Sequence, residues 1–358
     1  MTFLDFVLMF IKVVIIFAGV MTMVPLMIYL ERKIVAFFQL RIGPNRTGPL
    51  GLSQPIADAI KLMMKEDITP AGVDKTLYFL APLMAMIPAL LACAVIPFGP
   101  ASWTRITDLN HSLLFSLALS SLAVYAIALA GWASNNKYSL MGAVRSASQM
   151  ISYELGMGLA IIALLMVTGT LNLREIVDQQ HDNGWNIVRA PTMFIAFFVY
   201  IICGIAETNR APFDLAEAES ELVAGFHTEY SSFKFAMFFM AEYVNMVIIS
   251  ALATALFFGG WSGPGVHFDV SPQTGQLVMD NGNFVHIGMA LLGVVYFIAK
   301  MFAFLFLYIW LRATLPRFRY DQLMNFGWKR LVPISLANIF VMAIWIAILN
   351  RWNGVSGW

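Results

Sequence analysis

Charge, cysteine and histidine are all scarce in this chain of 358 residues. Charged side chains make up 12% of it, against about 25% in a soluble domain, and basic and acidic residues nearly cancel at 22 and 21. This composition excludes a soluble globular protein and a basic nucleic-acid-binding protein. The two cysteines, Cys93 and Cys203, are too few for a disulfide framework or a four-ligand metal site, and their apolar surroundings indicate small buried side chains.

Motifs that bind redox cofactors are missing as well. The sequence has no glycine-rich phosphate loop, no cysteine pair and no histidine pair, and its five histidines are scattered. We therefore expect that the chain by itself binds no metal, haem, iron–sulfur cluster, flavin or nucleotide. Any redox chemistry would have to come from partner proteins.

Long apolar runs dominate the sequence instead. Apolar residues make up 59% of it, and the mean hydropathy is +0.75. A membrane helix needs about 20 mostly apolar residues. Eight runs qualify, and they cover roughly residues 4–30, 77–98, 112–133, 150–170, 191–206, 235–260, 287–311 and 331–349. We predict an all-α polytopic membrane protein with eight transmembrane helices. The first run is too long for a signal peptide and has no basic segment before it.

Positive charge is concentrated on one side of these spans. The loops after the first, third, fifth and seventh runs hold sixteen of the 22 basic residues, which are Arg32, Lys33, Arg41, Arg46, Lys61, Lys65, Lys75, Lys137, Arg145, Arg210, Lys234, Arg312, Arg317, Arg319, Lys329 and Arg330. The opposite loops hold four. Because cytoplasmic loops carry the excess of Lys and Arg, both termini are predicted to lie on the outer, periplasmic side.

The first inner loop, residues 31–75, contains a predicted surface helix. Glycine and proline crowd residues 43–51, which excludes a regular element there. From Pro55 to Lys65, apolar residues recur at helical spacing and charged residues occupy the other face, as in a helix that lies along a membrane surface. Such a helix is either a simple anchor or, with the first span, the frame of an opening from the lipid into the protein.

The third inner loop, residues 207–234, is acidic on the side where basic residues prevail. Its acids are Glu207, Asp214, Glu217, Glu219, Glu221 and Glu229, against Arg210 in the same stretch. We expect a helix over 214–225 that places Asp214, Glu217 and Glu221 on one face. The helix dipole accounts for acids in the first turn only. Since clustered carboxylates favour protonation of one another, the pattern indicates proton handling.

Charged residues also lie within the predicted spans, where they are costly and usually functional. Glu154 follows Tyr153 near the inner start of the fourth span, Glu242 lies in the sixth, and Lys300 lies near the middle of the seventh. Lys300 is expected to pair with a carboxylate, with Glu154 and Glu242 as candidates. A chain of Glu, Tyr and Lys side chains with trapped water would extend the acidic cluster into the membrane.

Two long motifs carry a family resemblance. The first reads Glu31-Arg32-Lys33, then Gln39-x-Arg41-x-Gly43-Pro44-Asn45-Arg46-x-Gly48-Pro49-x-Gly51, then Ala57-Asp58-x-x-Lys61-Leu62-x-x-Lys65-Glu66. The second runs from Ala206-Glu207-Thr208-Asn209-Arg210-Ala211-Pro212-Phe213-Asp214 through Glu221 to Gly225, and shorter matches fall at 131–135, 151–154 and 316–323. With these motifs the chain closely resembles the family of quinone-site membrane subunits of respiratory complex I. The long 261–286 loop favours the bacterial form.

The resemblance implies a subunit of proton-translocating NADH:quinone oxidoreductase in the bacterial inner membrane. Such a protein docks a hydrophilic arm that carries flavin and iron–sulfur clusters, contacts small membrane subunits and antiporter-like subunits, and admits ubiquinone or menaquinone to a tunnel. The resemblance assigns a polar path to Glu154, Glu207, Asp214, Glu217, Glu219, Glu221 and Glu242. Arg210 would balance these acids, and the tunnel or docking side would hold Arg32, Arg41, Asp58, Lys61, Arg312 and Arg317.

Three alternatives remain open at this point. The related membrane subunit of an energy-converting hydrogenase would use no quinone. A stand-alone ion carrier would need inverted repeats, which the sequence does not show. A purely structural anchor for the hydrophilic arm would explain the basic inner loops, but it leaves the cost of the charges within the spans unexplained.

Overall fold

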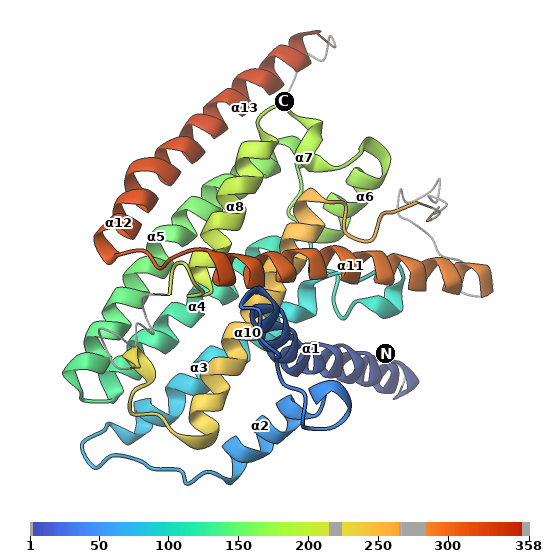
Figure 1. Ribbon diagram of the computed structural model, residues 1–358. Helices are drawn as coiled ribbons and strands as arrows, with labels where there is room; N and C mark the ends of the chain where they lie inside the picture. Colours follow the sequence, from blue (N-terminus) through green and yellow to red (C-terminus); the bar gives the residue numbers. More distant parts are fainter. Residues whose placement is uncertain (1–2, 215–223, 265, 267–283, 353–358) are drawn as a thin grey trace.

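The computed structural model describes residues 3–214, 224–264, 266 and 284–352, and these residues form helices and connecting loops without strands. The longer helices are α1 Phe3–Phe38, α3 Lys75–Ala92, α4 Ser112–Ala133, α5 Lys137–Thr168, α8 Met193–Glu207, α10 Ser232–Phe257, α11 Phe284–Thr314 and α13 Val332–Trp352 (Figure 1). The shorter elements are η1 Pro49–Gly51, α2 Gln54–Met64, η2 Cys93–Val95, η3 Ser102–Thr104, α6 Leu173–Asn183, α7 Asn186–Arg189, η4 Gly225–His227, α12 Tyr320–Phe326 and η5 Gly327–Leu331. The predicted all-α class is confirmed for the described residues.

Most of these helices have the length and apolar composition of membrane spans, but the predicted number of spans is not confirmed. In the described part of the chain, 7 helical stretches are long and apolar enough to cross a membrane. The fifth predicted span falls on α8, which is apolar but has only 15 residues. A helix that short does not cross about 30 Å of hydrocarbon unaided. The count of eight spans and the outward termini therefore stay predictions.

Helix α5 begins earlier than the hydropathy predicts. The side chain of Asn136 caps it by accepting a hydrogen bond from the amide of Tyr138 at 3.0 Å. The first turns carry Ser, Arg and Gln, which lower the local hydropathy and hide this half of the helix from an apolar-run search. Glu154 therefore lies near the middle of α5, and its position near the inner start of a membrane span stays a prediction.

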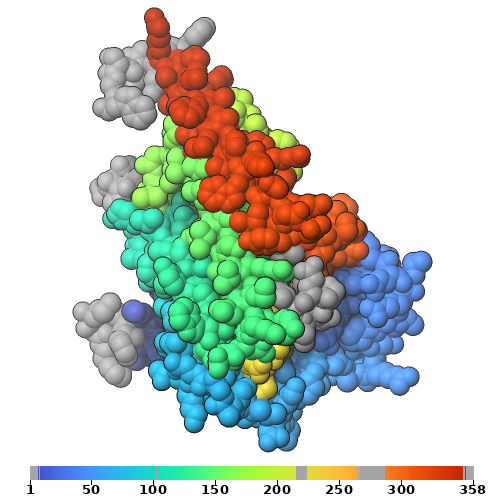
Figure 2. All heavy atoms as spheres, turned by 90° about the vertical axis from the view of Figure 1, so that its left-hand side faces the viewer, coloured from blue at the N-terminus to red at the C-terminus, as the bar shows by residue number. Residues whose placement is uncertain are grey.

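Helix α10 forms the centre of the molecule. It crosses the middle of the view in Figure 1, packs against α3, α8, α11 and α1, and has most of its residues buried. The buried shares of α1 and α13 are only 17% and 22%. Figure 2 shows α13, in red, lying above the green α5 on one face of the molecule. The exposed apolar surfaces of α1 and α13 must therefore face lipid or other proteins.

The helix predicted for residues 55–65 is present as α2, while its position along a membrane surface stays a prediction. Its apolar residues Ile56, Ile60 and Met63 are exposed, as expected for a helix whose apolar face meets lipid. On its polar face, Asp58 lies 2.6 Å from Arg32 of α1 and 3.4 Å from Lys61. The Asp58–Arg32 pair thus holds α2 beside α1.

Lys300 binds backbone carbonyls rather than a carboxylate. Its ammonium group donates hydrogen bonds to the carbonyl oxygens of Phe258, Gly260 and Ser262 at 2.7, 3.0 and 2.7 Å. The last carbonyls of a helix and the turn after it lack intrahelical partners, and α10 ends at Phe257. A cation on the neighbouring α11 satisfies several of them at once. The expected pairing of Lys300 with Glu154 or Glu242 is therefore wrong.

The segment that precedes α10 packs closely on α5. A Cβ atom added to Gly142 would lie 2.8 Å from the Cα of Gly225, so the two backbones approach at a distance that only glycine permits. His227 is buried two residues later, where its ring meets the edges of Phe226 and Phe235. Burial lowers the pKa of His227 to about 4, although the Asp214 carboxylate opposes this change.

We expect the folded state to lose stability in acid because His227 is held uncharged. Below a pH of about 6.5 the unfolded chain binds a proton at this residue, whereas the folded chain does so only near pH 4. The free energy of unfolding should therefore fall by about 2 kcal/mol between about pH 7.5 and about pH 5. His227→Gln should remove this share, as measured by thermal unfolding midpoints of the full chain in detergent. An identical pH dependence in both proteins would contradict the prediction.

Candidate functional site

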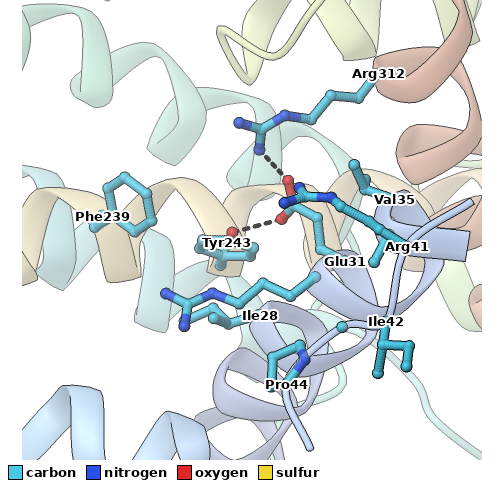
Figure 3. Close-up of a pocket in the computed structure, with 12 residues that line it drawn as sticks. Ile28, Glu31, Val35, Arg41, Ile42, Pro44, Phe239, Tyr243 and Arg312 are labelled. Carbon is cyan, nitrogen blue, oxygen red and sulfur yellow. Dashed lines mark hydrogen bonds and ion pairs between the residues drawn. The ribbon is translucent and has the colours of Figure 1, made fainter. Parts of the chain in front are cut away.

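A cavity of about 470 Å³ opens where α1, α10 and α11 meet the loop that follows α1. Apolar side chains such as Ile28, Val35 and Phe239 form part of its wall (Figure 3). Arg41, which belongs to the set predicted for the tunnel or docking side, reaches the cavity from the loop. The wall therefore offers apolar surface and charge together, which suits a ligand with a polar head and an apolar body.

Glu31 is the carboxylate of this cavity. It is 9% exposed, and Figure 3 shows it between Tyr243 and Arg312. The hydroxyl of Tyr243 donates a hydrogen bond to one carboxylate oxygen at 2.6 Å, and the guanidinium of Arg312 contacts the other. These donors compensate a buried charge that would otherwise be costly.

Arg210 connects this cavity with a second carboxylate. One guanidinium nitrogen lies 3.6 Å from Glu31, and another lies 3.8 Å from Glu242 of α10. The guanidinium carbon lies 4.2 Å from the centre of the Tyr243 ring, at the distance of a cation–π contact. A single cation is thus shared by two carboxylates that belong to different helices.

Two smaller cavities continue the row of polar groups beyond Glu242. The first has a volume of about 30 Å³ and is lined by Glu242, Glu207 and Asn245, among others. The second, of about 20 Å³, is also lined by Glu207 and Asn245, with Ser116 and Ser120 of α4. The walls of both are mainly apolar, but each cavity has several polar side chains and is large enough for a water molecule. Glu207 therefore stands between two sites that can hold water.

Glu154 and Tyr153 are neighbours in sequence but point to different surroundings. Ser121 of α4 donates a hydrogen bond to Glu154, which is close enough to Glu207 for the two carboxylates to repel each other. The hydroxyl of Tyr153 instead donates to the carbonyl of Leu323 at 3.0 Å. Consecutive helical residues point about 100° apart, which separates the two side chains. The structure thus places Glu154 beside Glu207, in the row of polar groups that begins at Glu31, whereas Tyr153 lies apart from this row.

The remaining predicted site residues form separate pairs. Asp214 is bound by Arg317 at 3.0 Å, and Glu229 accepts a hydrogen bond from Asn136 at 2.7 Å. Neither pair lines the cavities described above. The predicted acidic helix and its Glu217, Glu219 and Glu221 lie outside the described residues.

The sequence argument did not select Glu31, Tyr243 or Asn245 as site residues. Glu31 ends an apolar run beside Arg32, and Tyr243 and Asn245 interrupt the apolar sequence of α10 next to Glu242. Polar residues inside an apolar run were the signal that could have found them. Their proximity to Arg210 depends on how the helices cross, which the apolar runs of the sequence do not predict.

These features define a class of protein: a polytopic membrane subunit in which carboxylates and arginines lead from a cavity into a bundle of spanning helices. Among the residues that the structure describes, no group of three or more His, Cys, Asp or Glu could hold a metal ion. Residues 11–343 match the family model described as "NADH dehydrogenase". The chain belongs to this family, that of the H subunits of NADH-quinone oxidoreductase, as the motifs predict.

Relatives in several bacteria support this assignment over nearly the whole chain. The NADH-quinone oxidoreductase H subunit 2 of Koribacter versatilis is 49% identical over 356 residues, which cover 94% of this chain and 96% of the relative. The H subunit 1 of Geobacter metallireducens is 48% identical over 354 residues, or 97% and 98% of the two chains. The H subunit of Leptospira biflexa is 49% identical and covers 94% of each.

Proposed function

We propose that this protein receives a quinone in the Glu31 cavity and couples quinone reduction to proton translocation along Arg210, Glu242, Glu207 and Glu154. The position of Arg210 between Glu31 and Glu242 carries the proposal. Through it, a change of charge in the cavity acts directly on a carboxylate of the central helix. Quinone is proposed as the ligand because the similar proteins are H subunits of NADH-quinone oxidoreductases.

Reduction of a quinone consumes two electrons and two protons. The electrons would come from the flavin and iron–sulfur clusters of a hydrophilic arm, since the motifs that bind such groups are missing from this sequence. Ile28, Val35 and Phe239 provide apolar surface for the ring and tail. Tyr243 and Arg312 provide hydrogen-bond donors near the head group, where negative charge develops during reduction.

The coupling is electrostatic. At about 4 Å, two unit charges interact by about 4 kcal/mol at an effective dielectric constant of about 20, which changes a protonation equilibrium by nearly three powers of ten. When charge in the cavity changes, Arg210 is drawn toward Glu31 or released toward Glu242. The proton occupancy of Glu242 then changes, and with it that of Glu207 and the neighbouring carboxylate on α5.

The same proposal includes features that the sequence predicts. Glu217, Glu219 and Glu221 would extend the acidic path, and α1 with α2 would frame the passage for ubiquinone or menaquinone from the lipid. Arg32, Arg41, Asp58 and Lys61 lie on or beside that frame. Partner subunits of the complex would cover the exposed faces of α1 and α13 in the bacterial plasma membrane.

The alternatives lose support in different ways. The three relatives reported above are NADH-quinone oxidoreductase subunits, which favours quinone over the hydrogenase form. A purely structural anchor needs no arginine between two buried carboxylates. Such an arrangement destabilises the fold, and charged residues that are kept in spanning helices despite this cost usually have a function.

Replacing Glu207 with glutamine tests the proposal. The amide keeps the shape and one accepting oxygen but cannot carry a proton, so quinone-dependent NADH oxidation and proton pumping should fall by about tenfold or more. Oxidation of NADH by an artificial acceptor that takes electrons from the flavin should stay normal. Membranes that hold the assembled complex provide both measurements.

Glu175→Gln is the matched control, because Glu175 is exposed on α6 and bonded to Thr170. This control should leave both activities unchanged. Normal pumping in Glu207→Gln would sink the proposal.

A further inference from the structure

The two small cavities beside Glu207 share one uncharged polar side chain. Asn245 lines the cavity that contains Glu242 and also the cavity that contains Ser116 and Ser120. It lies three residues after Glu242, so both side chains occupy one face of α10. Asn245 is therefore placed where a path from Glu242 to the far side of Glu207 has to pass.

The surroundings of Asn245 leave its amide facing the cavities. It is half-buried in a spanning helix, and no hydrogen bond joins it to another residue in the described ranges. The polar groups that line the two cavities with it include Glu242 on its own helix, Glu207 on α8, and the hydroxyls of Ser116 and Ser120 on α4. A polar group at such a depth is stable only with a polar partner, and both cavities have room for water.

We propose that Asn245 is a positioning residue that holds the water through which a proton passes between Glu242 and Glu207. The proton leaves the carboxyl group of Glu242 for this water, and another proton of the water passes to the carboxylate of Glu207. The water is regenerated, Glu242 is now a carboxylate, and Glu207 is now protonated. The inference rests on the proposed function and adds the connection between its two carboxylates.

An asparagine suits this place for a chemical reason. Its amide donates through NH₂ and accepts through the carbonyl oxygen, so it can hold a water in either orientation. Unlike a carboxylate or a histidine, it has no proton to exchange near neutral pH, so it does not compete with Glu207. The rival explanation is that Asn245 only fills space between α10, α8 and α4.

A pair of substitutions of equal shape separates polarity from packing. Asn245→Thr keeps a hydroxyl that donates and accepts, whereas Asn245→Val has the same branched shape without it. Both are compared in the assembled complex in sealed membrane vesicles, by proton pumping and quinone-dependent NADH oxidation. Asn338→Val provides the control, because Asn338 is buried in α13 and lines none of these three cavities.

We expect the Val variant to pump at least about fivefold more slowly than the Thr variant, the effect of losing one buried hydrogen bond. Its rate should also become more sensitive to replacement of H₂O by D₂O, because proton transfer then limits turnover. Packing alone would not change that sensitivity. The Asn338 control and artificial-acceptor activity should stay normal.

The other outcomes are equally decisive. Equal rates and equal solvent isotope effects in the Thr and Val variants would overturn the inference, even if both are slow, because shape alone would then matter. If Glu207→Gln is impaired in the same assay while Asn245→Val is normal, the proposed function stands and only the role of Asn245 fails. If Glu207→Gln pumps normally, the proposed function itself fails. A Val variant that does not assemble is replaced by Asn245→Leu, tested against Asn245→Gln in the same way.

Discussion

Replacing Arg210 with leucine is expected to lower quinone-dependent NADH oxidation at least about a hundredfold. The proposed coupling acts through this cation with about 4 kcal/mol, and each 1.4 kcal/mol or so of lost transition-state stabilisation is a factor of ten in rate. Glu31 and Glu242 both lose the cation that they share, although Glu31 keeps its contacts with Tyr243 and Arg312. The measurement compares quinone and artificial-acceptor activities in membranes, with the amount of assembled complex determined in parallel.

Two further variants make this result specific to charge. Arg210→Lys keeps a cation but not the planar group that reaches both carboxylates, so it should retain only part of the activity. Adding Glu31→Gln to Arg210→Leu removes one of the two carboxylates that shared the cation and should restore assembly more than activity. If Arg210→Leu oxidised NADH with quinone at a normal rate, Arg210 would not connect the cavity with Glu242.

Replacing Lys300 with methionine should destabilise the protein by about 3 kcal/mol, roughly one for each hydrogen bond lost. The carbonyls of Phe258, Gly260 and Ser262 would lose their shared donor next to the end of α10. Because α10 forms the core, we expect less assembled complex in membranes and a lower thermal midpoint of the purified complex. The activity per assembled complex should remain close to normal.

Lys329→Met serves as the control, since Lys329 is exposed on η5 and pairs with no acid in the described chain. It should leave the amount of complex and its midpoint unchanged. A Lys300→Met complex of normal stability but low activity would instead return Lys300 to the proton path that the sequence predicts.

Much of the fold follows from local properties of the sequence. Apolar runs locate the long helices to within a few residues, except where the end of α1 and the first half of α5 carry polar residues. The amphipathic spacing of residues 55–65 predicts α2, and the two long motifs identify the family. These signals lie within one helix or one loop, so neighbours in sequence are enough to reveal them.

The site is different, because its members come from distant parts of the chain. Arg210 was singled out to balance acids, but its position between Glu31 and Glu242 required α1, α8 and α10 to meet at one point. Lys300 looked like the partner of a carboxylate because a buried cation needs compensation. In the structure, backbone carbonyls provide that compensation, and a pattern of side chains in the sequence cannot predict such backbone contacts.

The sequence by itself therefore determined that this is a helical membrane protein of the NADH dehydrogenase family, with costly charges inside its spans. Hydropathy and motif spacing depend only on the order of residues along the chain, so they can be determined without the tertiary structure. Only the tertiary structure decided which charges share a cavity and which stand apart, as with Glu154 and Tyr153. Ion pairs and hydrogen bonds form only between groups within about 4 Å of each other, so the crossing of helices sets partners that sequence distance does not.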